Sequence, residues 1–189
     1  MPAVVVMPSA ESPLMTADEF LRLYVDEDRM ELIDGVVTHL PGTGFQKGLI
    51  CANVAADIGN FVYDNRLGRV AINDTFIRTK PDAVRGADLV FVSYAVLPAE
   101  VPTPKGALAP PVELVAEVRA STECLVTLMT KATEYIAAGV QVVLIVDIES
   151  RAVAVFRANQ LPQRFEPSDT LTLPDVLPGF SVQVAKLFE

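Results

Sequence analysis

The chain has little of the residue types on which several common kinds of site depend. Its 189 residues include two cysteines, one histidine and no tryptophan. Cys51 and Cys124 have no neighbours at metal-ligand spacing, which argues against a structural zinc site. Both lie in segments with helical patterning, so we expect buried free thiols. Neither a disulfide nor a cysteine nucleophile is expected, since His39 would have to be the base.

The chain also lacks a long apolar run and an excess of positive charge. No run approaches the roughly 20 residues that cross a bilayer, and the N-terminus has too few basic and apolar residues for a signal peptide. We therefore expect a cytoplasmic protein that does not bind membranes. The net charge of −9 argues against binding nucleic acid by bulk electrostatics.

One segment is a local exception to this acidic balance, because basic side chains outnumber acidic ones between residues 66 and 85. The basic residues are Arg66, Arg69, Arg78, Lys80 and Arg85. Such a patch suits phosphate contacts, although an ordinary solvated surface can have the same composition.

What the chain does contain is enough apolar material for a core. Its 51% apolar and 21% charged residues predict an ordered chain, and its length suits one domain. We expect a loose lead-in over residues 1–15 and a single domain over residues 16–189.

The periodicity of apolar residues predicts the main elements. Helices are expected from Thr16, where Glu19 completes a capping box, and over about 46–63 and 122–138, with a short helical turn at the C-terminus. Strands are expected over 30–34, 36–40, 69–72, 75–78, 89–92, 112–118, 140–148, 152–157 and 180–182. Residues 80–86 and the proline-rich stretch 98–111 are expected to be loops. This order predicts an α/β (α+β) domain with helices flanking a central mixed β-sheet, in which 112–148 forms a crossover between two parallel strands.

Three carboxylates open or interrupt apolar strands: Glu31, Asp88 and Glu117. An ionised carboxylate among apolar neighbours is costly unless a cation or several donors meet it. Glu117 is the clearest case, since no turn carries it to water. Two interpretations stay open at this point, a metal ion or an internal ion pair with Arg119 or Arg85.

Lys131 is a second unusual residue, about two turns into the third expected helix. Helical side chains lean toward the N-terminus, so Lys131 could reach back toward the strand that carries Glu117. The alternative is a lysine that extends along the helix flank to solvent.

Several stretches share an order and spacing that carry a family resemblance. They are Glu31-Leu-Ile-Asp-Gly35, Pro81 to Ser93, Leu114-Val-Ala-Glu-Val118, Lys131 with Tyr135-Ile-Ala-Ala-Gly-Val140, Val146-Asp147 and Leu177-Pro-Gly-Phe180. Through them the run from Thr16 to Phe188 resembles the Uma family of restriction-type endonucleases. That family is common in bacteria and belongs to the PD-(D/E)xK nuclease-like superfamily.

The resemblance implies a restriction-endonuclease-like core and a metal-dependent endonuclease that hydrolyses DNA phosphodiester bonds. Asp88 and Glu117 would bind Mg2+ or Mn2+, for which oxygen ligands are suited. Glu31 would be an auxiliary acid, and Lys131 would replace the motif lysine and stabilise negative charge on the phosphate. Candidates for substrate contacts are Gln46, Arg78, Arg85 and Arg119. A homodimer is expected, because enzymes that cut both strands often act as symmetric pairs.

The sequence departs from the family pattern at three places. Ala87 replaces the motif proline, Phe45 and Gln46 stand where the family often has histidine, and Arg119-Ala-Ser-Thr122 replaces Leu-Ser-Pro-Ser. Arg119 occupies the position of the superfamily's lysine, and the high pKa of arginine makes it a poor proton shuttle. A second hypothesis is therefore a catalytically inactive relative that acts as a nucleic-acid or protein interaction module. A third, a small-molecule enzyme on another α/β fold, has no phosphate-binding glycine motif or Ser/His/Asp arrangement to support it.

Overall fold

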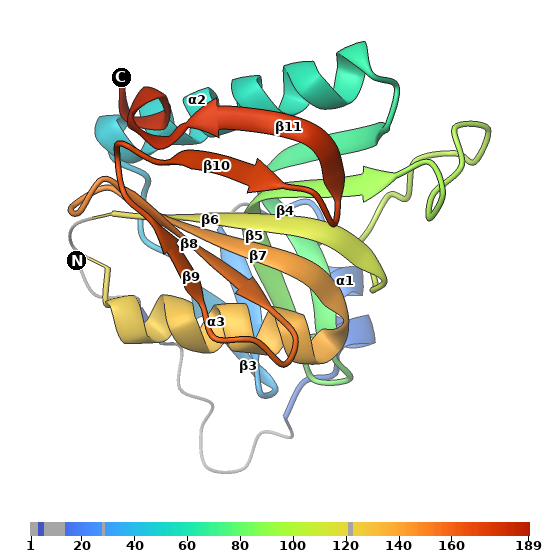
Figure 1. The fold of residues 1–189 in the computed structure, drawn as a ribbon. Coiled ribbons are helices and arrows are strands. Elements are labelled where there is room, and N and C mark those ends of the chain that lie inside the picture. Colours follow the sequence, from blue (N-terminus) through green and yellow to red (C-terminus); the bar gives the residue numbers. More distant parts are fainter. Residues whose placement is uncertain (1–3, 6–13, 28, 121–122) are drawn as a thin grey trace.

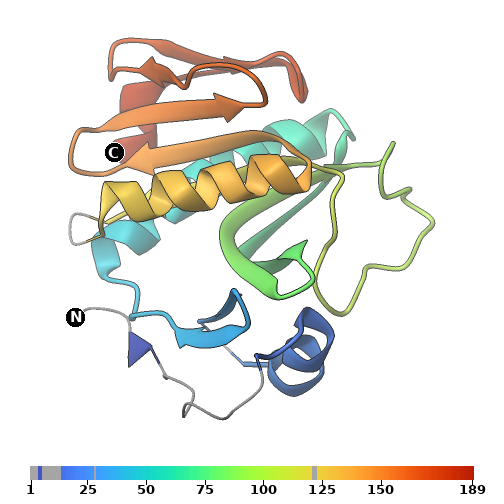
Figure 2. The same cartoon turned by 90° about the horizontal axis from the view of Figure 1, so that it is seen from below.

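The computed structural model describes residues 4–5, 14–27, 29–120 and 123–189. Within these ranges, a nine-stranded sheet lies between helix α3 (Leu125–Ala138) on one face and helix α2 (Phe45–Asp64) with a small second sheet on the other (Figure 1). Helix α1 (Ala17–Tyr24) and the hairpin of β2 (Met30–Ile33) and β3 (Val36–His39) lie at the opposite end of the molecule from the second sheet (Figure 2). This is the predicted mixed sheet flanked by helices.

The large sheet is antiparallel except at one pair of strands. Its spatial order is β1 (Val4–Val5), β3 (Val36–His39), β2 (Met30–Ile33), β5 (Ala83–Ser93), β6 (Val112–Arg119), β7 (Val140–Asp147), β8 (Ala152–Arg157) and β9 (Gln163–Phe165), with β4 (Gly68–Lys80) paired to β5. Strands β6 and β7 are parallel and are joined through α3 (Leu125–Ala138), which confirms the predicted crossover. The second sheet pairs β10 (Thr170–Leu173) with β11 (Leu177–Gln183).

The helices begin and end where local chemistry favours it. Helix α1 (Ala17–Tyr24) has the predicted capping box, in which Thr16 and Glu19 exchange hydrogen bonds. Helix α3 ends at Gly139, whose φ of 109° is a left-handed conformation that favours glycine. Helix α2 (Phe45–Asp64) and the short helix η1 (Val184–Phe188) match the predicted second helix and final turn.

The predicted loop at residues 80–86 is wrong, because β4 and β5 form one long hairpin across it. Only Pro81 and Asp82 lie between the two strands. Strand β4 also unites two predicted strands: Asn73 and Asp74 have φ values of 70° and 55° and form a bulge between Ile72 and Thr75. Strand β4 therefore continues through two residues whose left-handed backbone conformation is more typical of turns.

Other boundaries also differ from prediction. The lead-in contains β1, which pairs with β3, while the rest of residues 1–13 lies outside the described residues. Helix α3 begins at Leu125; its predicted start at residue 122 lies outside them too. Strands β9 and β10 were not predicted, because they are only three and four residues long. Both thiols are free as predicted, but Cys124 is exposed, so its predicted burial is wrong, whereas Cys51 is half-buried in α2.

The core lies on both faces of the sheet. On one face, α2 buries residues spaced four apart, which are Ile50, Val54, Ile58 and Val62. On the other face, α3 buries Leu128, Ala132 and Tyr135. No helix in the described ranges is long and apolar enough to span a membrane.

Two glycines make a matched test of this packing. A Cβ at Gly68 would lie 2.2 Å from the carbonyl oxygen of Val92, whereas one at Gly59, inside α2, would meet nothing within 4 Å. We expect Gly68→Ala to lower the free energy of unfolding by more than about 1 kcal/mol and Gly59→Ala to raise it by up to about 1 kcal/mol. Urea denaturation measures both changes. Equal free energies of unfolding for the two variants would contradict the predicted clash between the methyl group that Gly68→Ala adds and the backbone of the β4–β5 hairpin.

Candidate functional site

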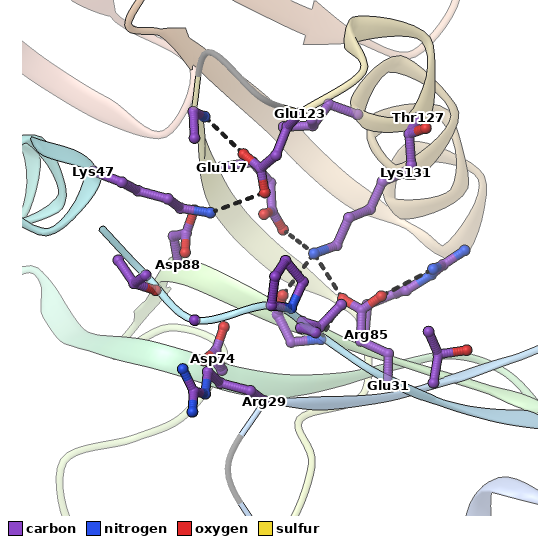
Figure 3. A pocket seen from close by; sticks show the side chains of 18 of the residues that line it. Arg29, Glu31, Lys47, Asp74, Arg85, Asp88, Glu117, Glu123, Thr127 and Lys131 are labelled. Atoms are coloured by element: carbon purple, nitrogen blue, oxygen red, sulfur yellow. Dashed lines mark hydrogen bonds and ion pairs between the residues drawn. The ribbon is translucent and has the colours of Figure 1, made fainter. Parts of the chain in front are cut away.

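A cavity of about 670 Å³ lies between the 40–44 loop, α2, α3 and the β2, β4, β5 and β6 strands. Most of the predicted site residues line it, namely Glu31, Gln46, Arg85, Asp88, Glu117 and Lys131. Arg78 and Arg119 are absent from its walls. Figure 3 shows its charged side chains converging from strands and helices that are far apart in the sequence.

The two predicted metal ligands are neighbours across β5 and β6. Leu89 pairs with Ala116 in this antiparallel ladder. This is the last pair of the ladder, and Asp88 and Glu117 are the next residues of their two strands. Leu89 and Ala116 pack on the α2 side of the sheet, whereas Asp88 and Glu117 line the cavity. The N–H of Val118, which follows Glu117, donates to Asp88 Oδ2 at 2.7 Å and so links the two strands at this point.

The ammonium group of Lys131 meets three oxygen atoms at the floor of the cavity. It lies 2.7 Å from Glu31 Oε1, 2.9 Å from Glu117 Oε1 and 2.7 Å from the carbonyl oxygen of Gly86. These contacts use all three of its N–H donors. Tyr135 donates a further hydrogen bond, of 3.0 Å, to Glu117 Oε1. Lys131 therefore reaches back as predicted, and the alternative of a solvent-directed lysine is wrong.

Arg85 supports this lysine from the other side of Glu31. It donates to Glu31 Oε2 at 3.0 Å and pairs with Glu134 at 2.5 Å. The N–H of Gly86 donates to Glu31 Oε1 at 3.1 Å. Arg85 thus pairs with internal carboxylates, and its predicted contact with substrate stays a prediction. It is also not the partner of Glu117, whose ion pair is with Lys131.

The other predicted substrate-contact arginines are also engaged elsewhere. Arg119 pairs with Asp147 at 2.9 Å and with Glu149 at 3.2 Å, so the structure does not show the ion pair with Glu117 that was left open as an alternative. Arg78 pairs with Asp18 at 2.7 Å on the outer surface. The reason in each case is a carboxylate brought close by the fold from a distant part of the sequence.

The predicted basic patch is not a free positive surface either. Lys80 pairs with Asp34 at 2.9 Å, and Arg69 donates to the carbonyl groups of the proline-rich loop. Arg78 and Arg85 have the partners described above. Three of the five basic side chains, Arg78, Lys80 and Arg85, therefore pair with carboxylates.

Burial and neighbouring charges set the protonation of the site. Burial among apolar groups raises the pKa of Glu117 to about 7, and Asp88 and Glu31 add to the shift, although Lys131 opposes it. Burial alone would raise the pKa of Glu31, but Lys131 and Arg85 outweigh it, so that this pKa is below its ordinary value. Burial likewise opposes the charge on Lys131, but Glu117 and Glu31 raise its pKa, and it stays cationic.

Sequence reasoning missed several residues of the cavity. Asp74 projects from the β4 bulge, and its pKa is raised by burial and by Asp88. The Asn73-Asp74 pair was the available signal, because these residue types tolerate a left-handed backbone. Lys47 and Glu123 were also missed, because nothing in their local spacing marks them; Lys47 pairs with both Asp88 and Glu123.

One oxygen atom of each carboxylate accepts no hydrogen bond from the described residues. Asp88 Oδ2 accepts from the N–H of Val118 at 2.7 Å and lies 3.3 Å from Lys47 Nζ, while Lys131 and Tyr135 both use Glu117 Oε1. Within the described residues, Asp88 Oδ1 and Glu117 Oε2 accept no hydrogen bond. The same residues contain no cluster of three or more His, Cys, Asp or Glu able to hold a metal. Two carboxylates still fit Mg2+, which keeps several water ligands.

Comparisons with known proteins agree with this fold. The sequence model of the Uma2 family, described as "Putative restriction endonuclease", matches residues 17–185. A solved structure of "a putative nuclease belonging to DUF820" from Anabaena variabilis superposes with a TM-score of 0.81 at 20% identity, covering 92% of this chain and 97% of that one. At that identity the likeness shows a common fold. No curated protein matches the chain.

The pKa of Glu117 predicts a pH-dependent stability. In the folded state Glu117 keeps its proton up to about pH 7, whereas in the unfolded state it keeps it only up to about pH 4.5. Its contribution to the free energy of unfolding is therefore largest at acid pH and is lost as the pH rises between these values. Glutamine does not titrate, so we expect Glu117→Gln to be free of this pH effect. The free energy of unfolding of wild type should therefore fall relative to that of the variant as the pH rises from 4.5 to 7. Denaturant titrations across this range check it; a constant difference would contradict the raised pKa.

Proposed function

This chain belongs to the family described as "Putative restriction endonuclease", and on that premise we propose that it is a Mg2+- or Mn2+-dependent endonuclease that hydrolyses DNA phosphodiester bonds. One observation carries the proposal. Asp88 and Glu117 follow the last pair of the β5–β6 ladder, both line the cavity, and each has a carboxylate oxygen that accepts no hydrogen bond from the described residues. Placing the partly buried Asp88 beside the buried Glu117 is unfavourable unless a cation offsets their charges.

The residues have separate tasks in this proposal. Asp88 and Glu117 would hold the ion, which polarises the phosphate and lowers the pKa of the attacking water. Lys131 stabilises negative charge that develops on the phosphate oxygens. Glu31 keeps Lys131 at the floor of the cavity, and Tyr135 fixes the carboxylate of Glu117. Arg85 and Gly86 in turn hold Glu31 in place.

We extend the proposal to a homodimer that acts on DNA in the cytoplasm. A symmetric pair supplies one cavity for each strand of a duplex. The net charge of −9 requires that DNA be held by local contacts and by the cation, since the overall field repels it.

A second candidate is an inactive relative that binds nucleic acid or protein. The observation in its favour is that Lys131 already pairs with both Glu31 and Glu117, and Lys47 with Asp88, so lysines meet all three acids without a metal. Under this alternative the acids serve stability alone, and no cation binds.

Manganese binding separates the two candidates. We expect calorimetry to detect Mn2+ binding by wild type that Asp88→Asn/Glu117→Gln loses, and we expect only wild type to nick supercoiled plasmid with Mg2+ or Mn2+. These substitutions keep the side-chain shapes, so the loss reports the charges. The control Glu166→Gln/Asp175→Asn removes the same charge from exposed carboxylates outside the cavity and should bind and nick as wild type does. Wild type that binds no Mn2+ would favour the inactive relative, and nicking by the double variant would overturn the assigned site.

A further inference from the structure

The two lysines of the cavity are held very differently. Lys131 Nζ has three oxygen partners at 2.7 to 2.9 Å. Lys47 Nζ has two contacts, at 3.3 Å to Asp88 Oδ2 and 3.4 Å to Glu123 Oε1. Charge-assisted N–H···O bonds are usually about 2.7–2.9 Å long, so both contacts of Lys47 are loose. Lys47 is therefore the lysine that can leave its partners at small cost.

Lys47 also approaches the acids from the opposite wall. It lies in the first turn of α2, whereas Lys131 comes from α3, and Figure 3 shows the two side chains reaching in from opposite sides. The side chains of Lys47 and Asp88 are 16% and 13% exposed, while those of Glu117 and Glu31 are 5% and 3% exposed. The Lys47–Asp88 pair therefore lies nearer to solvent, where an entering phosphate arrives first.

We infer that Lys47 is an exchangeable counter-ion of the site: it neutralises Asp88 in the metal-free protein and binds a phosphate oxygen of DNA once a divalent cation occupies Asp88. The inference rests on the proposed nuclease function and adds a phosphate-binding residue that the sequence did not indicate. A cation at Asp88 repels the ammonium group 3.3 Å away, which removes the attraction that holds it there. A phosphate joined to the same cation offers a new anionic partner within reach.

If Lys47 exchanges Asp88 for a phosphate, removing its charge should raise the affinity for metal and lower the affinity for DNA. Lys47→Met removes the charge that competes with a cation at Asp88, so we expect Mn2+ affinity without DNA to rise about two- to five-fold, as for a partly exposed ion pair. The same variant loses a phosphate contact. We expect its affinity for a short fluorescein-labelled DNA duplex in Ca2+ to fall about five-fold or more, and the slope of log affinity against log salt to decrease by about 1.

Matched variants control for charge and folding. Lys47→Arg keeps the charge and should retain the salt slope of wild type, while Lys186→Met removes a lysine that pairs with Asp57 outside the cavity and should change neither affinity. Lys47→Gln repeats the neutral substitution with a polar side chain, so that a folding defect in one variant does not decide the result.

Calorimetry for Mn2+ and fluorescence anisotropy for DNA give distinguishable outcomes. If wild type binds both and the neutral Lys47 variants match it, the role of Lys47 is wrong and the proposed function stands. Tighter Mn2+ binding with unchanged DNA affinity would make Lys47 a counter-ion alone and overturn its phosphate role. If wild type binds neither probe, the nuclease proposal fails, and the inference fails with it.

Discussion

The contact on which this structure depends most is the ammonium group of Lys131. It joins Glu31 of β2, Gly86 of β5 and Glu117 of β6 to α3 through three short contacts. Removing one partner from a buried ion pair typically costs about 3–5 kcal/mol, because the remaining charges lose their compensation. The two glutamates can therefore stay buried at the floor of a cavity only while this lysine is present.

The same contact leaves the site with unmet negative charge. Lys131 pairs with the two glutamates and not with Asp88, whose one ion pair among the described residues is the loose contact with Lys47. Burial is the largest cause of the raised pKa of Glu117, at about 7, and Asp88 and Glu31 add to it while Lys131 opposes it. A divalent cation relieves the repulsion that lysines only partly offset. The physical argument for a metal thus rests on negative charge that the lysines only partly offset, and not on how many acids line the cavity.

The sequence predicted those features that depend on residues close in the chain. The capping box at Thr16, the C-terminal Gly139 of α3 and the reach of Lys131 all follow from helical geometry. It did not predict the partners of Arg85, since Glu134 lies 49 residues away and only folding brings the two together. The bulge at Asn73 and Asp74 was missed for a related reason. Residues that favour turns adopt that backbone inside a strand when long-range pairing on both sides holds the strand together.

The most direct measurement is anomalous X-ray diffraction from crystals soaked in Mn2+ at saturating concentration. The account predicts one strong manganese peak in the cavity, bound by Asp88 Oδ1 and Glu117 Oε2, with Lys131 still in contact with Glu31. Crystals that show no manganese at these carboxylates, with both acids still paired to their lysines, would contradict the claim that the buried acids are placed to hold a cation.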